Sequence, residues 1–325
     1  MPAAHQAKPV VVVGRKLPPA VEARLGAAYR PKFNPDDRLY STAELLALAD
    51  GAAAIMPCHT EHFSAQVIAR LPESVRIIAN VSVGVDHVDL EAARARGIVV
   101  TNTPDVLSDA TAEIAMLCML GAARRGGEGE RLIRAGRWTS WSPAFMVGTQ
   151  ITGKRFGVLG MGRVGQVTAR RARGFGMRIH YHNRRRLEPD AEAGAIWHET
   201  VEDLLPHCDV LSLHCPAMPE TENLIDAARL ALMPDGAILV NTARGAIVDE
   251  AALMAALRSG KLAAAGLDVF KNEPAIDPAF REIENAFLLP HIGSATHETR
   301  DAMGFRALDN LDAFFAGQAP RDRVA

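Results

Sequence analysis

One ten-residue stretch decides the fold of the second half of the chain: Phe156-Gly157-Val158-Leu159-Gly160-Met161-Gly162-Arg163-Val164-Gly165. A short apolar run enters the pattern G-x-G-x-x-G, helical spacing follows, and a second apolar run occupies residues 177–181. This strand–turn–helix context makes the pattern specific for dinucleotide binding, whereas a glycine turn alone is weak evidence. Gly160 permits the tight turn, Gly162 lets a pyrophosphate approach the backbone, and Gly165 allows the helix to pack closely on the strand. The N-terminus of that helix then offers free N–H groups to the anion.

Short apolar runs alternate with helix-length amphipathic stretches on both sides of this motif. The runs occupy residues 10–13, 52–56, 77–80, 98–101, 156–159, 179–181, 210–214, 237–241, 264–267 and 287–289. Because they are continuously apolar, they predict strands of parallel sheets that are covered on both faces. Strands that alternate with helices predict an α/β protein with doubly wound, Rossmann-like sheets.

The alternation is interrupted once, and this interruption predicts two domains. Residues 108–123 form a long, mostly apolar stretch typical of a helix, and residues 126–149 look irregular. A chain of 325 residues also exceeds what one hydrophobic core usually organises. We expect a first domain from residues 1–103 and 296–325, to which a helical stretch at 296–317 returns. Residues 104–295 are expected to form the dinucleotide-binding domain.

The end of the second strand of the motif indicates which dinucleotide is bound. Asn183, Arg184 and Arg185 stand about 20 residues after the glycines, where an NAD site usually has an acidic residue for the ribose 2′-hydroxyl. Arginine binds a 2′-phosphate through parallel, charge-assisted hydrogen bonds. The loop therefore predicts that NADP(H) is preferred and that NAD(H) is possible. A solvated run of surface charge is the alternative interpretation.

The bulk composition excludes several classes of protein. Hydrophobic residues make up 48% of the chain and the formal net charge is -2, which argues against disorder and against a surface that binds nucleic acid. The four cysteines have no C-x-x-C spacing, so neither a disulfide framework nor a metal site is expected. The apolar run at residues 10–13 is too short for a signal sequence or a membrane span. We expect a cytoplasmic protein that has no membrane contact.

Three residues with catalytic potential follow predicted strands in the second half: Arg244, Glu273 and His291. Open α/β sheets bind their ligands at the carboxyl ends of the strands. Reduction of a ketone by hydride builds negative charge on the oxygen, so that both a proton donor and a cation are needed. Each residue also has an alternative interpretation when taken singly: the arginine as an ion-pair partner, the histidine as a helix cap and the glutamate as a solvated acid.

Five motifs occur together, in an order and at a spacing that resemble those of the D-isomer-specific 2-hydroxyacid dehydrogenase family. They are the glycine motif, T-A-R-G at 242–245, G-L-D-V-F with E-P at 266–274, P-H-I-G-S at 290–294, and S-V-G-V-D-H at 82–87. The resemblance covers nearly the entire chain. It implies that both chain ends form a flavodoxin-like substrate-binding domain, that an NAD(P)-binding Rossmann domain lies between them in sequence, and that the active site lies in the cleft.

The resemblance also implies roles for individual residues. Arg244 would bind the carboxylate and keto oxygen of the substrate, His291 would be the general acid, and Glu273 would pair with it. The backbone N–H groups around Val83–Gly84 would hold the carboxylate, and Asp268 would face the nicotinamide carboxamide. Further cofactor contacts are expected at Met161, Arg163, Val164, Cys215, Pro216, Thr221, Thr242, Ala243 and Gly293.

The substrate is indicated by resemblance alone. Residues 138–143, which contain Trp138 and Trp141, resemble the glyoxylate and hydroxypyruvate reductase branch, in which an aromatic side chain of this loop can reach a neighbouring subunit. The expected reaction is reduction of a small 2-keto acid to the 2-hydroxy acid by a homodimer. Alternatives are a dehydrogenase for another D-2-hydroxy acid, a formate dehydrogenase, because His87 follows Asp86 as it does in those enzymes, or a non-catalytic dinucleotide sensor. Simple packing of the two tryptophans is equally compatible with the sequence.

Overall fold

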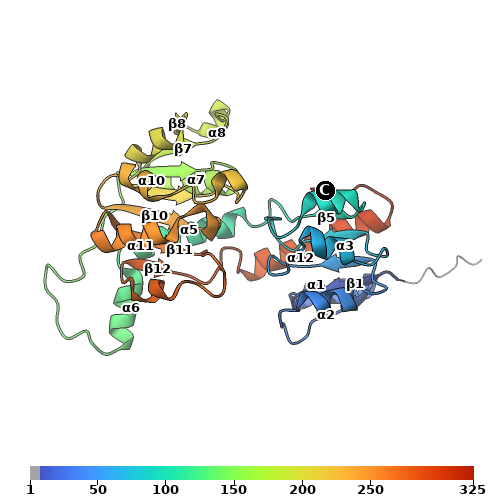
Figure 1. Cartoon of the computed structure of the whole chain (residues 1–325). Coiled ribbons are helices and arrows are strands. Elements are labelled where there is room, and N and C mark those ends of the chain that lie inside the picture. The colour runs from blue at the N-terminus through green and yellow to red at the C-terminus, as the bar shows by residue number, and fades with distance from the viewer. Residues whose placement is uncertain (1–7) are drawn as a thin grey trace, which may run out of the picture. The chain divides into compact units, whose positions relative to one another are not determined.

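The computed structural model describes residues 8–325, and these divide into two compact units (Figure 1). Unit 1 consists of the chain up to Leu107 together with Ala295–Ala325, and unit 2 consists of Ser108–Ser294. The sequence predicted the two domain boundaries between residues 103 and 104 and between residues 295 and 296. Each unit contains its own sheet and its own buried core.

Unit 1 is built on a five-stranded sheet in the order β2-β1-β3-β4-β5, in which all pairs are parallel. Val11 and Val13 of β1 pack on the side of α1 and α12, while Val12 packs on the side of α2, α3 and α4. Both faces are buried, as the continuously apolar strands predict. The elements are β1 (Val10–Val13), α1 (Pro19–Ala28), β2 (Arg30–Lys32), α2 (Thr42–Leu48), β3 (Ala54–Met56), α3 (Ala65–Arg70), β4 (Ile77–Ala79), α4 (Leu90–Ala95), β5 (Val99–Thr101) and α12 (His297–Phe315).

The last helix, α12, returns to unit 1 as the sequence predicts. Thr296 caps its N-terminus by accepting a hydrogen bond from the Thr299 N–H at 3.1 Å. Its buried side chains join those of α1 and β1, and a Cβ added to Gly304 would lie 2.5 Å from Val21 of α1. The two helices therefore pack closely, and residues near the two ends of the sequence share one core.

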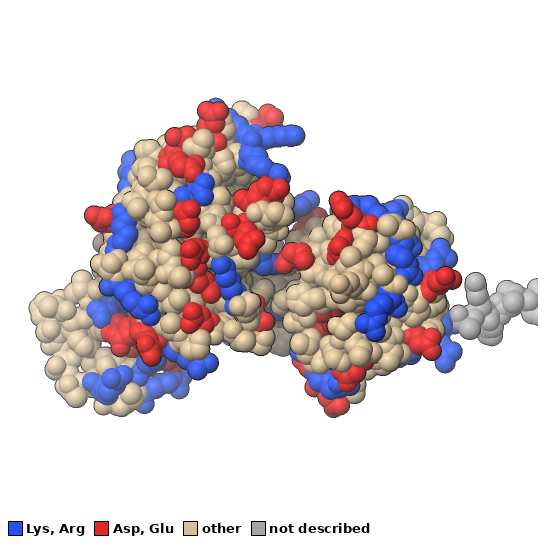
Figure 2. Space-filling model, in the orientation of Figure 1, with Lys and Arg blue, Asp and Glu red and all other residues tan. Residues whose placement is uncertain are grey.

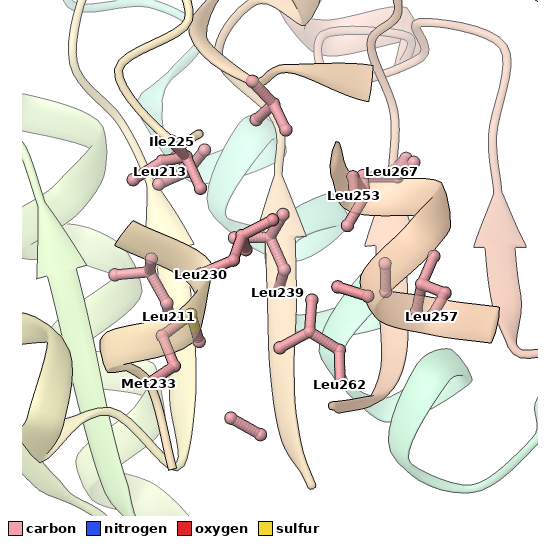
Figure 3. Packing of buried hydrophobic residues seen from close by; sticks show 14 of the residues in the cluster. Leu211, Leu213, Ile225, Leu230, Met233, Leu239, Leu253, Leu257, Leu262 and Leu267 are labelled. Carbon is pink, nitrogen blue, oxygen red and sulfur yellow. The ribbon is translucent and has the colours of Figure 1, made fainter. Parts of the chain in front are cut away.

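Unit 2 is built on a seven-stranded parallel sheet in the order β12-β11-β10-β9-β6-β7-β8. Leucines of β9, β10, α10 and α11 form one of its two cores (Figure 3). The strands are β6 (Arg155–Leu159), β7 (Arg178–His182), β8 (Ile196–His198), β9 (Val210–Leu213), β10 (Ala237–Asn241), β11 (Leu262–Leu267) and β12 (Ala286–Leu288). The helices are α5 (Ser108–Ala123), α6 (Gly126–Arg134), α7 (Arg163–Gly174), α8 (Pro189–Glu192), α9 (Val201–Leu204), α10 (Ala227–Leu232) and α11 (Glu250–Ser259), with short 3₁₀ turns at Leu205–His207, Pro219–Thr221, Gly245–Ile247 and Pro278–Glu282.

Three elements differ from the sequence-based expectation. The segment 126–149 is not irregular throughout, because its first nine residues form α6. The first half of α6 contains three glycines, which disfavour a helix, and its only large apolar residues are Leu132 and Ile133, so the sequence gives little sign of a helix that packs on a core. Strands β2 and β8 were not predicted, since both lie at the end of their sheet and carry polar residues.

The surface carries both signs of charge. Acidic and basic side chains are interspersed over the face shown in Figure 2. Within residues 8–325, no helix has the length and apolar character needed to cross a membrane. All four cysteines are free thiols.

Candidate functional site

The site residues predicted in unit 2 follow the carboxyl ends of its strands. Gly160 follows β6, Asn183 follows β7, Arg244 comes shortly after β10, and His291 comes shortly after β12. In the sheet, β6 is paired with β9 although β7 and β8 lie between them in sequence. The strand order therefore reverses between β6 and β9, which is the place where open α/β sheets bind ligands.

The three glycines of the motif have the different surroundings that a dinucleotide turn requires. Gly160 has a φ of 94°, and an added Cβ would lie 2.5 Å from the backbone N of Cys215. A Cβ on Gly165 would lie 2.5 Å from the carbonyl oxygen of Gly160, so this glycine is needed for packing of α7. A Cβ on Gly162 would meet nothing within 4 Å, although Gly162 caps α7 without any side-chain hydrogen bond. An open space thus faces the N-terminus of α7, which suits a pyrophosphate.

The loop after β10 contains a second feature that suits a ligand. The Asn241 side chain accepts a hydrogen bond from the Ala243 N–H at 3.0 Å and donates to the Arg244 carbonyl at 2.9 Å. The hydroxyl of Thr242 is buried and has no hydrogen-bond partner among the described residues. Buried hydroxyls are normally paired. A bound cofactor would supply the missing partner of Thr242.

Asn183 has a structural role in the glycine turn. Its Oδ1 accepts a hydrogen bond from the Met161 N–H at 2.6 Å, so the end of β7 holds the turn after β6. Arg186 pairs with Glu192 at 2.7 Å, and the hydrogen bonds from Arg186 and Tyr181 lower the pKa of Glu192 to about 2. Arg184 and Arg185 are exposed, and neither forms a salt bridge within residues 8–325. Both guanidinium groups are therefore open to solvent beside the glycine turn.

His291 and Glu273 meet directly. The Nδ1 of His291 lies 2.6 Å from Oε2 of Glu273, and both side chains are about one-quarter exposed, at 28% and 25%. The other oxygen of Glu273 accepts a hydrogen bond from the Phe270 N–H at 2.6 Å. Because an ionised carboxylate can only accept, Nδ1 carries the proton in this pair. The Nε2 atom is therefore the one that can exchange a proton with a substrate.

Asp268 holds the segment that carries His291. Its side chain is only 1% exposed, and its two oxygens accept hydrogen bonds from the N–H groups of Ile292 and Gly293, each at 2.8 Å. Burial raises the pKa of Asp268, and these two hydrogen bonds oppose that shift. His291 has a φ of 54°, a left-handed conformation that non-glycine residues seldom adopt, and such conformations cluster at functional sites.

Arg244 is partly buried at the start of the turn Gly245–Ile247. One of its terminal nitrogens donates to the Ala243 carbonyl at 2.8 Å. A Cβ on Gly245 would lie 2.0 Å from the backbone carbon of Phe270. Only glycine permits this approach, which brings the loop of Arg244 against the loop that leads to Glu273.

The other predicted cofactor contacts in unit 2 lie in the same set of loops. The Thr221 hydroxyl accepts from the Met218 N–H and donates to the Pro216 carbonyl, both at 2.8 Å, which closes the loop after β9. Burial raises the pKa of Cys215 to about 11, so that this residue is a neutral thiol and not a nucleophile. Arg163 and Val164 begin α7, and Gly293 lies against Asp268.

The predicted turn Val83–Gly84 lies in unit 1, after β4. His87, which the sequence compared with formate dehydrogenases, is buried, and its Nε2 lies 2.8 Å from Oδ1 of Asn80. Sequence reasoning did not identify Asn241, Asn80 or Asn102, whose side chains hold the loops. The sequence signal that could have identified these residues is an asparagine at or just after the end of a buried strand.

A doubly wound parallel sheet with this glycine turn, and with a histidine–carboxylate pair at its carboxyl edge, defines a nicotinamide-dependent dehydrogenase. Residues 116–293 match the model for the NAD-binding domain of the D-isomer specific 2-hydroxyacid dehydrogenases. The chain belongs to the D-isomer specific 2-hydroxyacid dehydrogenase family, and it is an oxidoreductase that acts on the CH–OH group of 2-hydroxy acids.

Its relatives support this assignment over nearly the whole chain. A glycerate dehydrogenase from Hyphomicrobium methylovorum is 41% identical over 312 residues, which cover 95% of this chain and 97% of the relative. A solved D-isomer specific 2-hydroxyacid dehydrogenase from Polaromonas sp. JS6 66 is 45% identical with a TM-score of 0.93, covering 98% of this chain and 100% of that one. The NADPH-dependent glyoxylate/hydroxypyruvate reductase from Sinorhizobium meliloti, solved with NADP and malonate, is 34% identical with a TM-score of 0.87, covering 98% and 97%.

The open space at Gly162 leads to a test of the cofactor turn. In Gly162→Ala, the new methyl group meets no protein atom within 4 Å, so the melting temperature should change by less than about 2 °C. The same methyl group would project toward the pyrophosphate, so NADPH affinity, measured by fluorescence titration, should fall at least about tenfold. Gly174→Ala, in open space at the end of the same helix, is the matched control. Unchanged NADPH affinity in Gly162→Ala would contradict the assignment.

Proposed function

We propose that this enzyme reduces glyoxylate, hydroxypyruvate or both to the 2-hydroxy acid, with NADPH as the preferred cofactor. The observation that carries the proposal is the contact of 2.6 Å between His291 Nδ1 and Glu273 Oε2. The contact supports a hydrogen bond from Nδ1–H to the carboxylate, and in the proposed reaction a second proton, on Nε2, passes to the keto oxygen and leaves the neutral imidazole. The nicotinamide supplies the hydride.

The proposed reaction gives roles to four further parts of the site. Glu273 orients the imidazole by accepting a hydrogen bond from its Nδ1. Arg244 binds the carboxylate of the substrate and polarises its keto oxygen, since guanidinium matches a carboxylate with two parallel hydrogen bonds. The N–H groups around Val83–Gly84 also bind the carboxylate. Asp268, besides holding the His291 segment, faces the carboxamide of the nicotinamide.

The preference for NADPH rests on Asn183, Arg184 and Arg185. An acidic residue, which would repel the 2′-phosphate, is absent from these three positions, and both arginines are exposed. The Sinorhizobium meliloti relative is named as NADPH-dependent and was solved with NADP. NAD(H) is expected to serve less well.

Exchange of Arg184 tests the cofactor preference. In Arg184→Asp, the KM for NADPH should rise about tenfold or more, because a cation that pairs with the 2′-phosphate becomes an anion, whereas the KM for NADH should stay within about twofold. Arg178→Asp makes the same change of charge at the opposite end of β7 and serves as the control. Equal effects on both cofactors would count against the assignment.

The catalytic roles predict a specific pattern in steady-state kinetics. A panel of glyoxylate, hydroxypyruvate and pyruvate should show turnover with NADPH, fastest with one of the first two. His291→Ala should lower kcat by about 10²- to 10⁴-fold with NADPH binding retained, since a positioned general acid contributes that much. Arg244→Ala should also raise the KM for the keto acid. Turnover of His291→Ala near the wild-type rate would refute the role of the histidine, and a wild-type enzyme that reduces none of the three acids would refute the substrate class.

We also propose that the enzyme is a cytoplasmic homodimer. The free cysteines suit a reducing compartment. Helix α6 and the loop that follows it extend from the rest of unit 2 (Figure 1). They expose large apolar side chains, with 63% of Ile133, 55% of Trp138 and 74% of Trp141 accessible. Such a concentration of exposed apolar surface is typical of an interface between subunits.

The solution mass tests the dimer. The wild-type enzyme should have twice the chain mass of 34.9 kDa in light scattering. Ile133→Glu should shift the equilibrium toward the monomer, because a charge would be buried in the interface. Leu232→Glu introduces the same charge at an exposed leucine of α10 and should leave the mass unchanged. A monomeric wild-type enzyme would contradict the proposal.

A further inference from the structure

The turn after β4 in unit 1 has an unusual pattern of main-chain hydrogen bonds. Four successive carbonyls, those of residues 82–85, each accept a hydrogen bond. The Ser82 carbonyl accepts from the Thr103 N–H at 2.9 Å, and the Val85 carbonyl accepts from the Val88 N–H at 2.9 Å. The two carbonyls between them accept from side chains.

The side-chain donors are Asn102 and Ser82. The Nδ2 atom of Asn102 donates to the Val83 carbonyl at 2.9 Å. The hydroxyl of Ser82 donates to the Gly84 carbonyl at 2.8 Å. Because a carbonyl can only accept, the orientation of the Asn102 amide is determined by this contact.

These bonds determine where the N–H groups of the turn point. In a planar trans peptide the N–H is antiparallel to the C=O of the same peptide group. Asn102, by holding the Val83 carbonyl, turns the Gly84 N–H to the opposite side, and Ser82 does the same for the Val85 N–H. Within residues 8–325, neither of these N–H groups donates a main-chain hydrogen bond. Main-chain N–H groups in a turn that have no main-chain partner can donate hydrogen bonds to an anion such as a carboxylate.

Asn102 is itself held by a buried polar cluster at the end of the chain. Its N–H donates to the Asp322 carbonyl at 3.2 Å, and its carbonyl accepts from Asn310 Nδ2 at 3.3 Å. Arg306 donates twice to the Asp322 carboxylate, at 2.5 and 2.8 Å, and Asn310 donates to it at 3.1 Å. Burial opposes the charge of Asp322, but the hydrogen bonds from Arg306 and Asn310 outweigh it and keep the pKa of this carboxyl below its usual value.

We propose that Asn102 is a positioning residue for the carboxylate of the substrate. Together with Ser82 it aims the N–H groups of Gly84 and Val85, while Arg306, Asp322 and Asn310 keep Asn102 in place from α12 and the segment after it. The inference rests on the proposed function of the turn as the carboxylate-binding element. In this proposal the N–H groups of Gly84 and Val85 bind the carboxylate. The side chains of Asn102 and Ser82 orient these N–H groups and do not themselves contact the substrate.

Steady-state kinetics of Asn102→Ala and Asn102→Leu test the proposal. Both variants lose the donor to the Val83 carbonyl, and only the first also loses volume. Both should raise the KM for glyoxylate by about tenfold, with kcat within about threefold of wild type and the KM for NADPH unchanged. The inhibition constant of oxamate, a keto-acid mimic that cannot accept hydride, should rise by the same factor.

Two further variants keep the result interpretable. Asn285→Ala also removes an amide that donates to two carbonyls, at 3.2 and 3.1 Å, but at the amino end of β12, and it should leave the KM for glyoxylate unchanged. Ser82→Ala removes the second side-chain donor and should also raise the KM for glyoxylate. If the Asn102 variants do not fold, an unchanged KM for glyoxylate in Ser82→Ala overturns the inference that these side chains orient the peptide groups.

The outcomes separate this inference from the proposed function. If the wild-type enzyme reduces glyoxylate and the Asn102 variants keep its KM within about twofold, the positioning role is overturned and the proposed function stands. If Asn102→Leu restores the wild-type KM while Asn102→Ala does not, Asn102 only fills space, and the inference is again overturned. A wild-type enzyme without activity on any 2-keto acid would overturn the proposed function itself.

Discussion

The rest of the structure depends on one constraint, which is that neighbouring strands of both sheets are parallel. Because neighbouring strands run in the same direction, every connection crosses back over the sheet, and all carboxyl ends emerge at one edge. Most loops at that edge therefore start from a buried strand whose position is set by the core. In the larger sheet the loops after β6 and β9 are neighbours, and Gly160 lies so close to Cys215 that no side chain fits between them. The candidate site residues of unit 2 come together because their loops all start at this edge.

The loops themselves are held by polar side chains bonded to the main chain. Asp268 binds two N–H groups of the His291 segment, Asn183 binds the glycine turn, and Asn102 binds the turn of unit 1. Loops at a surface cannot be organised by apolar burial alone, since their main-chain groups need partners. An amide or a carboxylate supplies a partner and also sets an orientation. Loss of such a side chain leaves a main-chain group unpaired, which costs about 1–3 kcal/mol when that group is buried.

The chemistry and the choice of substrate have different structural origins. In the proposed function the chemistry depends on the pair of His291 and Glu273, on the glycine turn and on the sheet that positions them. Relatives of similar identity carry different names, glycerate dehydrogenase in one case and glyoxylate/hydroxypyruvate reductase in another. One fold commonly supports several reactions, so the fold and the family by themselves do not fix the substrate.

The sequence by itself determined the α/β class, most strands, the return of the last helix and the family, because apolar periodicity and glycine spacing are local properties of the chain. It also placed Arg244, Glu273 and His291 after strands. It missed β2, β8 and α6, whose polar or glycine-rich sequences bury little apolar surface. The resemblance implied that Glu273 pairs with His291, and the structure gives that contact its geometry. Only the tertiary structure showed that Asn183 holds the glycine turn and that Asn102 holds the Val83 carbonyl. Such contacts join residues far apart in sequence through one hydrogen bond each, and a single hydrogen bond leaves no periodic pattern in the sequence.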